Sequence, residues 1–422
     1  MLPLLSCTPY AKNIRSNDGP PPVIKDPQAE PIGEFMAHLY SYPTGRFDPA
    51  WWNAARDQDS KVTSALPDGF HFAEKNAVLN PNAFTPLGPQ PLNQGNDRVT
   101  GRINDIVVSP QPLIAGDQNS YRVFVASDGG GVWRSDNCCS VNTTFTNVTD
   151  DPDIQSIAIG DLEMDPNNPN VIYAGTGDLR FGSWSFGSAG VLKSSDGGNT
   201  WDVLGREVFV PNYPASLSAF PQYQAIGKVL VDPGNSNQLA VGTKTGLYFS
   251  YDAGATWSGP CLTNPYGPTS NNRHRQDITA LNAVRSGGTT TLYAAVGARG
   301  SATPVQPDLD QNGANGVYRT NWPTAACPAV NAWTLISREN NGWPANTGVG
   351  VSFAPFGRVE LAIAPSQPNV IYAKTINTSD FEIQAVYRSV DGGNTWQLRS
   401  QPFGASFTGC LPGGQNWYNA GI

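Results

Sequence analysis

The segment Ser194–Trp201 reads SSDGGNTW, and it recurs as SYDAGATW at Ser250–Trp257 and as SVDGGNTW at Ser389–Trp396. All three copies fit the pattern S-x-D-x-G-x-T-W. The first and second copies start 56 residues apart, and the second and third start 139 residues apart, which is close to two further periods. Self-similarity at a fixed period is the signature of a repeat architecture, so we expect the chain to consist of equivalent units.

Weaker copies fill the gaps in this series. Gly316–Thr320 (GVYRT) resembles Ala385–Ser389 (AVYRS), which leads into the third complete motif, and Trp333-Thr334 stands in place of the closing aromatic strand. Gly131–Asp136 (GVWRSD) lies about one period before the first complete motif. The sequence therefore predicts five units, spaced by roughly 56–70 residues.

Each unit also has two short apolar stretches upstream of its motif. The first stretch ends at a proline turn in four units, at Ile106–Pro110, Leu162–Pro166, Val229–Pro233 and Leu361–Pro365. The second stretch is expected at Arg122–Ala126, Asn170–Gly175, Gln238–Gly242, Thr291–Val296 and Asn369–Ala373. One unit is thus four short strands joined by turns, which is the sheet of a β-propeller blade.

The predicted fold is an all-β propeller of four-stranded blades over residues 81–422, preceded by an N-terminal segment over residues 1–80. That segment contains a Pro-rich linker and the helical stretches Phe35–Tyr40 and Pro49–Val62. Five blades are visible, and Asn416–Ile422 (NWYNAGI) has the pattern of the first strand of a sixth. Ala83–Gly88 resembles a fourth strand without a blade, and propellers commonly close when such a strand completes the last blade. We therefore interpret the chain as a ring of six to eight blades that is incomplete at its C-terminal end; a five-bladed ring with a tail is the alternative.

The motif residues are expected to be structural. An aspartate in a tight turn accepts hydrogen bonds from nearby backbone N–H groups, glycine supplies positive φ, and the tryptophan packs between blades. The residues concerned are Ser194, Asp196, Gly198, Thr200 and Trp201 in the first copy, Ser250, Asp252, Gly254, Thr256 and Trp257 in the second, and Ser389, Asp391, Gly393, Thr395 and Trp396 in the third.

The three motifs resemble BNR, or Asp-box, repeats, which occur in sialidases, xyloglucanase-type glycoside hydrolases and sortilin-type receptors. Ser127–Arg134 (SDGGGVWR) is similar to the first-blade segment that carries a catalytic aspartate in xyloglucanase-type enzymes, so the resemblance implies that Asp128 is catalytic. The second catalytic aspartate of that family belongs to a second propeller, which this sequence lacks. A sialidase would need an Arg-Ile-Pro strand, and Arg102-Ile103-Asn104 departs from it at the third position.

Long, irregular connections are expected on one face of the propeller, and such loops commonly carry function. Aromatic and arginine side chains gather on them, as in a site that stacks on sugar rings and hydrogen-bonds their hydroxyls. The candidate ligand-binding residues are Arg180, Phe181, Trp184, Tyr213, Tyr223, Arg273 and Arg275. The alternative is that the aromatic side chains pack the loops onto the blades. Other carboxylates expected to reach this face are Asp178, Glu339 and Asp380.

The net charge and the pattern of metal-ligating residues limit the classes of partner that we expect for this protein. Only 14% of the residues are charged and the net charge is −8, which argues against a nucleic-acid-binding surface. No apolar run reaches the roughly 18 residues of a membrane-spanning helix. Asp308–Gly313 (DLDQNG) matches the opening of a calcium loop, with Asp308, Asp310 and Asn312 as ligands, but its twelfth position is Arg319 rather than glutamate. No cofactor is required, and an acidic hairpin loop is the alternative to a calcium site.

The cysteines indicate the compartment. Five of the six, Cys138, Cys139, Cys261, Cys327 and Cys410, fall in expected loops and suit an oxidising environment in which some of them pair; the alternative is that they are unpaired small apolar residues. Leu4-Leu5-Ser6-Cys7 has the form of a lipoprotein processing site. The sequence thus predicts an extracellular or cell-surface propeller that recognises a polysaccharide or glycoconjugate. The alternatives are a xyloglucanase-like glycoside hydrolase and a sortilin-like protein-binding propeller.

Overall fold

The structure of the chain is a computed structural model that describes residues 92–94, 97–99, 102–151, 153–179, 187–209, 224–244, 246–262, 276–298, 316–343, 356–377 and 383–400. The N-terminal segment 1–80, the strand expected at 83–88 and the sixth-blade strand expected at 416–422 lie outside these residues. Cys7, Cys410 and the candidate calcium ligands Asp308, Asp310 and Asn312 lie outside them as well.

The described chain forms five four-stranded antiparallel sheets, each with its strands in sequence order. Blade 1 contains β3 (Ile103–Val108), β4 (Tyr121–Ser127), β5 (Gly131–Cys138) and β6 (Thr146–Asn147). Blade 2 contains β7 (Ile159–Met164), β8 (Ile172–Thr176), β9 (Val191–Ser194) and β10 (Asp202–Leu204). Blade 3 contains β11 (Ile226–Asp232), β12 (Asn235–Thr243), β13 (Gly246–Ser250) and β14 (Ser258–Cys261). Blade 4 contains β15 (Gln276–Ser286), β16 (Thr289–Ala298), β17 (Gly316–Asn321) and β18 (Thr334–Leu335), and blade 5 contains β19 (Phe356–Ile363), β20 (Ile371–Asn377), β21 (Ile383–Ser389) and β22 (Gln397–Ser400).

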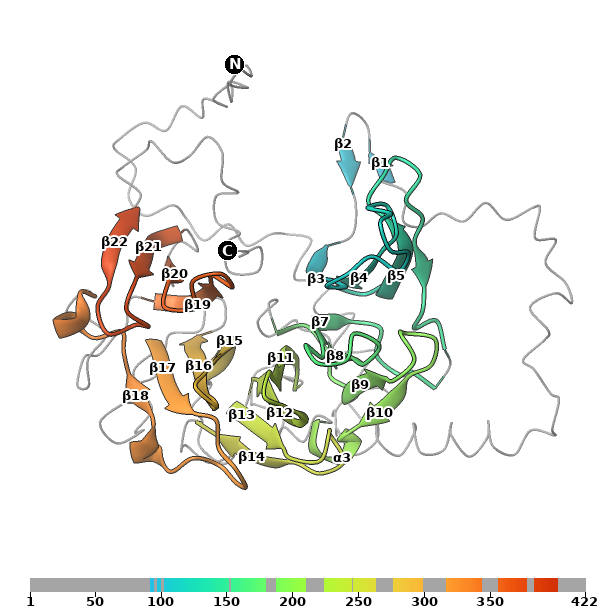
Figure 1. Cartoon of the computed structure of the whole chain (residues 1–422). Helices are drawn as coiled ribbons and strands as arrows, with labels where there is room; N and C mark the ends of the chain where they lie inside the picture. The colour runs from blue at the N-terminus through green and yellow to red at the C-terminus, as the bar shows by residue number, and fades with distance from the viewer. Residues whose placement is uncertain are drawn as a thin grey trace, which may run out of the picture.

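The blades follow one another around an arc, with the first strand of each on the inside (Figure 1). Blades 1 and 5 stand at the two ends of the arc. A short hairpin of β1 (Leu92–Gln94) and β2 (Asp97–Val99) precedes blade 1. Helical structure is confined, within the described residues, to α3 (Arg206–Phe209), η3 (Val330–Ala332) and η4 (Glu339–Asn341). The predicted all-β propeller is confirmed.

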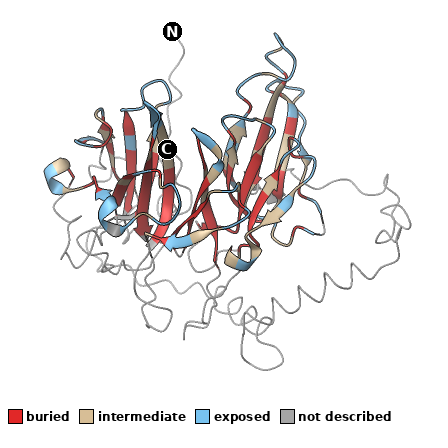
Figure 2. Ribbon diagram, turned by 60° about the horizontal axis from the view of Figure 1, so that its bottom comes forward, coloured by how far each residue is buried: buried red, intermediate tan, exposed pale blue. Residues whose placement is uncertain are grey.

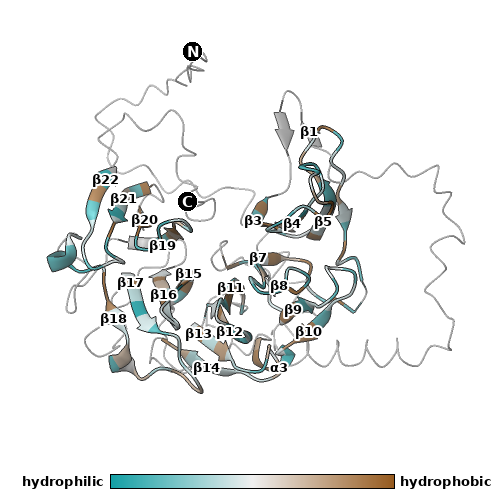
Figure 3. Cartoon of the chain, viewed as in Figure 1, coloured by the Kyte–Doolittle hydropathy of each residue, from teal (hydrophilic) through white to brown (hydrophobic). Residues whose placement is uncertain are grey.

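The core consists of four apolar layers, one between each pair of consecutive blades. Buried residues therefore run through the sheets while exposed ones gather at turns and outer edges, and hydropathy follows the same division (Figures 2 and 3). Trp201 packs in the layer between blades 1 and 2, Trp257 between blades 2 and 3, Trp333 between blades 3 and 4, and Trp396 between blades 4 and 5. Each blade needs a neighbour on both faces to bury its apolar side chains.

The S-x-D-x-G-x-T-W segments, here called box turns (residues 194–201, 250–257 and 389–396), join the third and fourth strands of blades 2, 3 and 5. In the first of them Ser194 Oγ donates to Asp196 Oδ1 at 2.8 Å and accepts from the N–H of Gly198 at 2.8 Å. Asp196 also accepts from the N–H and the hydroxyl of Thr200, at 3.0 and 2.8 Å. The other two turns repeat these bonds. The glycines at 198, 254 and 393 have φ of 83°, 94° and 90°, where a side chain would be strained.

Blade 1 has an expanded version of this turn that does not fit the S-x-D-x-G-x-T-W pattern. Asn137 stands in the place of the aspartate: Ser135 Oγ donates to its Oδ1 at 3.0 Å, and the N–H of Thr144 donates to the same oxygen at 2.9 Å. Six residues separate Asn137 from Thr144, against three in a box turn, so the spacing hides the relationship. Cys138 and Cys139, joined by a disulfide, lie within this insertion.

A second disulfide crosses a blade boundary. Cys261 at the end of β14 bonds to Cys327 in the connection between β17 and β18, with Cα atoms 5.5 Å apart. Tyr251 in the blade 3 box turn donates to the carbonyl of Ala326 at 2.9 Å in the same connection. Blade 4 lacks a box turn, and these contacts hold its longer connection against blade 3.

Candidate functional site

The two faces of the propeller differ in their connections. On one face the turns between first and second strands meet the box turns; the N–H of Gly197 donates to the carbonyl of Asn170 at 2.9 Å, for example. On the other face the connections between second and third strands meet those between blades, as where the N–H of Gly177 donates to the carbonyl of Ala158 at 2.8 Å. We call the second one the loop face. Asp128 and Asp178 both follow a second strand and so lie on it.

A charged cluster on this face joins blades 1 and 2. Arg102, just before β3, forms ion pairs through Nη2 with Asp128 Oδ1 at 2.8 Å and with Asp178 Oδ2. The backbone assists, because the N–H of Asp128 donates to the carbonyl of Arg102 at 3.0 Å. Arg102 and Asp178 are 76 residues apart in sequence, and no local motif links them. Their pairing is the part of the site that sequence reasoning missed.

The two carboxylates of this cluster have different exposure. The Asp178 side chain is fully buried, while 23% of the Asp128 side chain is exposed. Burial raises the pKa of the Asp128 carboxyl, and the neighbouring Asp178 carboxylate raises it further, while Arg102 acts in the opposite direction. Burial acts to lower the pKa of Arg102, but the two carboxylates outweigh it and its pKa is raised. Asp128 is therefore a partly accessible acid that holds its proton more strongly than an ordinary aspartate.

Glycines shape the chain next to Asp128. A side chain at Gly129 would meet nothing within 4 Å, so this residue borders open space. Gly130 is anchored, because its carbonyl accepts from Trp133 Nε1 at 2.9 Å and from Asn147 Nδ2 at 2.8 Å. Gly131 has φ of 74°, and a Cβ there would lie 2.2 Å from the hydroxyl oxygen of Thr149. The chain after Asp128 is thus open to an approaching molecule at Gly129, while the contacts of Gly130 and Gly131 hold its backbone in place.

Charged side chains also line the inner strands. Each first strand has a register shift near its loop-face end, at Ile103/Asp105, Ile159/Asp161, Ile226/Lys228, Ile278/Ala280 and Phe356/Arg358. Such bulges re-aim the side chains next to them. Carboxylates near the shifts in blades 1 and 2 accept backbone N–H groups of the next inner strand: Asp105 from Leu162 at 3.1 Å, Asp161 from Val229 at 2.9 Å and Glu163 from Val231 at 3.1 Å.

Two of these inner carboxylates hold protons near neutral pH. Burial raises the pKa of Asp161 to about 7, although Lys228 Nζ lies 2.6 Å from its Oδ1 and opposes the shift. Burial likewise raises the pKa of Glu163 to about 8, and the bond from Val231 N–H opposes it. These groups connect neighbouring blades, so their first effect is on the stability of the ring.

The other predicted site residues separate into two groups. Arg180, Phe181, Trp184, Tyr213, Tyr223, Arg273, Arg275 and Asp380 lie outside the described residues. Glu339, which we expected on the face of Asp128, lies elsewhere: it belongs to η4, whose Asn341 donates through Nδ2 to the carbonyl of Asn394 in the blade 5 box turn at 2.6 Å. That expectation was wrong because the segment after β18 packs along blade 5. Within the described ranges, no group of three or more metal-ligating side chains is found, and no helix is long and apolar enough to cross a membrane.

Comparison with known proteins yields distant relatives, and no family model matches the chain. A xyloglucanase of Paenibacillus sp. is 25% identical over 324 residues, which cover 67% of this chain and 30% of that protein. A xyloglucanase of Hypocrea jecorina is 23% identical over 323 residues, which cover 65% of this chain and 36% of that protein. The chain therefore spans about a third of the length of the curated relatives that it matches.

Solved structures that are similar to parts of the chain include a GH74 enzyme of Niastella koreensis, with a TM-score of 0.42 and 21% identity over 70% of this chain and 38% of that one. They also include the BP39L lectin of Burkholderia pseudomallei, with a TM-score of 0.35 and 16% identity over 70% of each chain.

Proposed function

We propose that this chain is part of a secreted glycoside hydrolase of the Asp-box superfamily that acts on a xyloglucan-like polysaccharide. The observation that carries the proposal is Asp128, a partly exposed carboxyl on the loop face whose pKa is raised by burial and by Asp178. A carboxylic acid that keeps its proton can protonate the leaving oxygen of a glycosidic bond. The distant similarity to xyloglucanases supports the same substrate class.

Asp178 and Arg102 position Asp128 in this proposal. Asp178 is fully buried and paired with Arg102, so it has no surface from which to contact a sugar. Its charge helps to keep Asp128 protonated. Hydrolysis needs a second carboxylate besides Asp128, and burial excludes Asp178 from that role. Arg102, occupied by two carboxylates, has little capacity left for an acidic sugar, and this disfavours a sialidase.

The test is the release of reducing ends from xyloglucan. We expect Asp128→Asn to lower the rate at least about a hundredfold, because general acid catalysis typically contributes 10²–10⁴-fold. Asp202→Asn is the matched control, since Asp202 is an exposed carboxylate on β10, the fourth strand of blade 2. Unchanged hydrolysis by Asp128→Asn would exclude the assigned role.

A second candidate is polysaccharide binding without cleavage. It is favoured by the burial of Asp178, because the carboxylate that shares Arg102 with Asp128 cannot act as the second catalytic group. The candidate aromatic residues Trp184 and Tyr223 would then bind the polysaccharide. Retention on immobilised xyloglucan without release of reducing ends, weakened by Trp184→Ala or Tyr223→Ala, would support it. Capture of a protein partner in place of polysaccharide would instead favour a sortilin-like role.

We also assign the protein to the outside of the cell. The disulfide between Cys261 and Cys327 supports this, because such bonds persist in oxidising compartments. Attachment to a lipid through Cys7 belongs to the same proposal and is tested by mass spectrometry of the mature N-terminus. A calcium ion at Asp308, Asp310 and Asn312 is tested by the effect of chelation on the melting temperature.

A further inference from the structure

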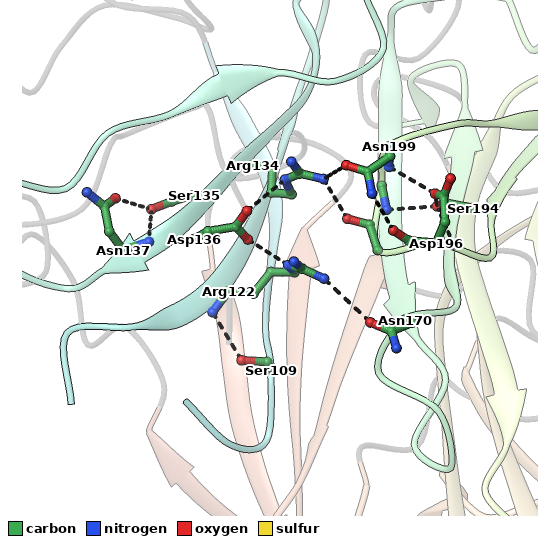
Figure 4. A network of polar contacts seen from close by, with 12 residues as sticks. Ser109, Arg122, Arg134, Ser135, Asp136, Asn137, Asn170, Ser194, Asp196 and Asn199 are labelled. Carbon is green, nitrogen blue, oxygen red and sulfur yellow. Dashed lines mark hydrogen bonds and ion pairs between the residues drawn. The ribbon is translucent and has the colours of Figure 1, made fainter. Parts of the chain in front are cut away.

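A repeated contact fastens each box turn to the blade before it. The residue after the box aspartate presents its carbonyl to a cation on the third strand of the preceding blade. Arg134 Nη1 donates to Gly197 O at 2.8 Å, Lys193 Nζ to Ala253 O at 3.2 Å, and Arg319 Nη1 to Gly392 O at 2.8 Å. Figure 4 shows the first of these contacts from Arg134 to the turn that contains Asn199.

An aromatic residue accompanies each of these cations. Directly across the sheet, on the second strand, Phe124 pairs with Arg134, Tyr173 with Lys193 and Tyr293 with Arg319. The ring lies under the turn: Tyr293 donates through its hydroxyl to Gly392 O at 3.2 Å, and a Cβ on Gly198 would lie 2.6 Å from Phe124. All three aromatic side chains are at most 4% exposed. The aromatic–cation pair is thus the receptor for a box turn.

Blade 3 shows what happens where no box turn follows. Its residues at the same two positions are Ala240 and Phe249, which are also register partners. The connection in blade 4 that faces them is not a box turn, and Phe249 packs there edge-to-face on Trp322 at 6.1 Å. The cation is absent from the blade whose neighbour lacks the turn, so the pair follows the turn and is not a general feature of the blades.

Blade 5 carries the complete receptor. Tyr372 and Arg388 are register partners at the same two positions, and the guanidinium lies 5.8 Å from the centre of the tyrosine ring. Tyr372 is 37% exposed, and Arg388 Nε is buried without a hydrogen-bond partner among the described residues. We propose that the face of blade 5 turned away from blade 4, through Tyr372 and Arg388, docks the box turn of a further propeller blade.

The cation also indicates which type of box turn fits. Arg134 and Arg319 each reach a second acceptor, Asn199 Oδ1 at 2.7 Å and Asn394 Oδ1 at 3.1 Å, three residues after the box aspartate. The turn received by Lys193 has Ala255 at that position. A guanidinium has several donors in a fixed fork and can bind both acceptors, whereas an ammonium acts as a single point charge. Arg388 therefore fits a turn of the form S-x-D-G-G-N-T-W.

The test uses the hairpin of the first box turn, whose receptor in blade 1 is the pair Phe124 and Arg134. The probe is a synthetic peptide of residues 191–204 (VLKSSDGGNTWDVL), closed by an added terminal disulfide and labelled for fluorescence polarisation against the 422-residue chain. We expect saturable binding that Arg388→Met weakens about tenfold, the scale of a lost hydrogen bond to a charged group. Replacing the asparagine of the peptide at position 199 by alanine should weaken it too. Arg206→Met, in α3 between blades 2 and 3, is the matched control and should bind as the original chain does.

Two results would overturn the proposal. One is a hairpin that fails to bind, or that binds Arg388→Met as well as the original chain. The other is a concentration-dependent dimer of the chain in light scattering that Arg388→Met dissociates, because the occupant would then be a second copy. Circular dichroism of Arg388→Met checks that the variant is folded. None of these outcomes depends on glycoside hydrolysis, so the proposal stands or fails separately from the proposed function.

Discussion

The contribution of a single carboxyl group to the stability of this protein rises or falls with pH, according to the surroundings of that group. Glu163 lies on the inner strand β7, and burial raises its pKa to about 8 from an ordinary value near 4.3. The folded state therefore binds a proton that the unfolded state releases between these two values. Its contribution to stability is fully present below about pH 4 and is lost as the pH rises towards 8.

The variant Glu163→Gln imitates the protonated form, so it should remove this loss. We expect its melting temperature to exceed that of the original chain at pH 8.5 by at least about 2 °C, and to match it at pH 4. Glu207→Gln, at an exposed glutamate in α3, is the control and should change neither value. Equal effects of Glu163→Gln at both pH values would contradict the assignment.

At the scale of the element, the box turn and its cation form one unit. Arg319 makes charge-assisted hydrogen bonds to Gly392 and Asn394, so Arg319→Met should lower the free energy of unfolding by about 1.5–3 kcal/mol. Arg388 Nε has no hydrogen-bond partner among the described residues, so Arg388→Met should leave the free energy of unfolding within about 0.5 kcal/mol of the original. Urea unfolding of the two variants side by side measures both values. A similar loss in both would show that the cations act only through their packing.

The packing of blade 4 against blade 3 is supported by a disulfide, whereas blades 2, 3 and 5 each contact the preceding blade through a box turn. Cys261 and Cys327 are 66 residues apart, and closing a loop of that length stabilises the folded chain by about 4 kcal/mol in the chain-entropy description. The double variant Cys261→Ser, Cys327→Ser should therefore unfold at distinctly lower urea concentration than the oxidised chain. Mild reduction should lower the midpoint of the original chain by more than that of the double variant, in which Cys138–Cys139 is the remaining described disulfide. A double variant as stable as the oxidised chain would contradict this role.

At the scale of the whole molecule, the two classes of carboxylate set a window of stability. Hydrogen bonds from Thr200 lower the pKa of Asp196 to about 2, and hydrogen bonds within their turns lower the pKa of Asp252 and Asp391 against the effect of burial. These groups contribute stability above about pH 4 that is lost as the pH falls towards 2. Asp161, at about 7, and Glu163, at about 8, act in the opposite sense.

The melting temperature should therefore be highest near pH 4, and it should decline on both sides. Asp196→Asn should make the acid side of the profile shallower, because the asparagine cannot lose stability by protonation, while it lowers stability at pH 5. Asp202→Asn, six residues further along and exposed on β10, is the control. A profile that rises steadily up to pH 8 would contradict the predicted window.

The sequence by itself determined the repeat, the order of strands and the residues of the box turns, because these depend on contacts within a few residues. Ser194, Asp196 and Thr200 hydrogen-bond to one another within one turn, so their spacing is visible in the chain. The expanded turn around Asn137 escaped detection because an insertion changed that spacing. Predicted site residues on the long loops, such as Trp184, remain predictions.

Only the tertiary structure decided which distant residues meet. Arg102 lies beside Asp178 because two blades pack face to face. The two residues are 76 positions apart, and no sequence pattern indicates that they are in contact. The pairing of each third-strand cation with the box turn of the next blade became visible in the same way. Contacts between blades depend on the rotation of one sheet against the next, which is set by side-chain packing over the whole layer and not by any local pattern.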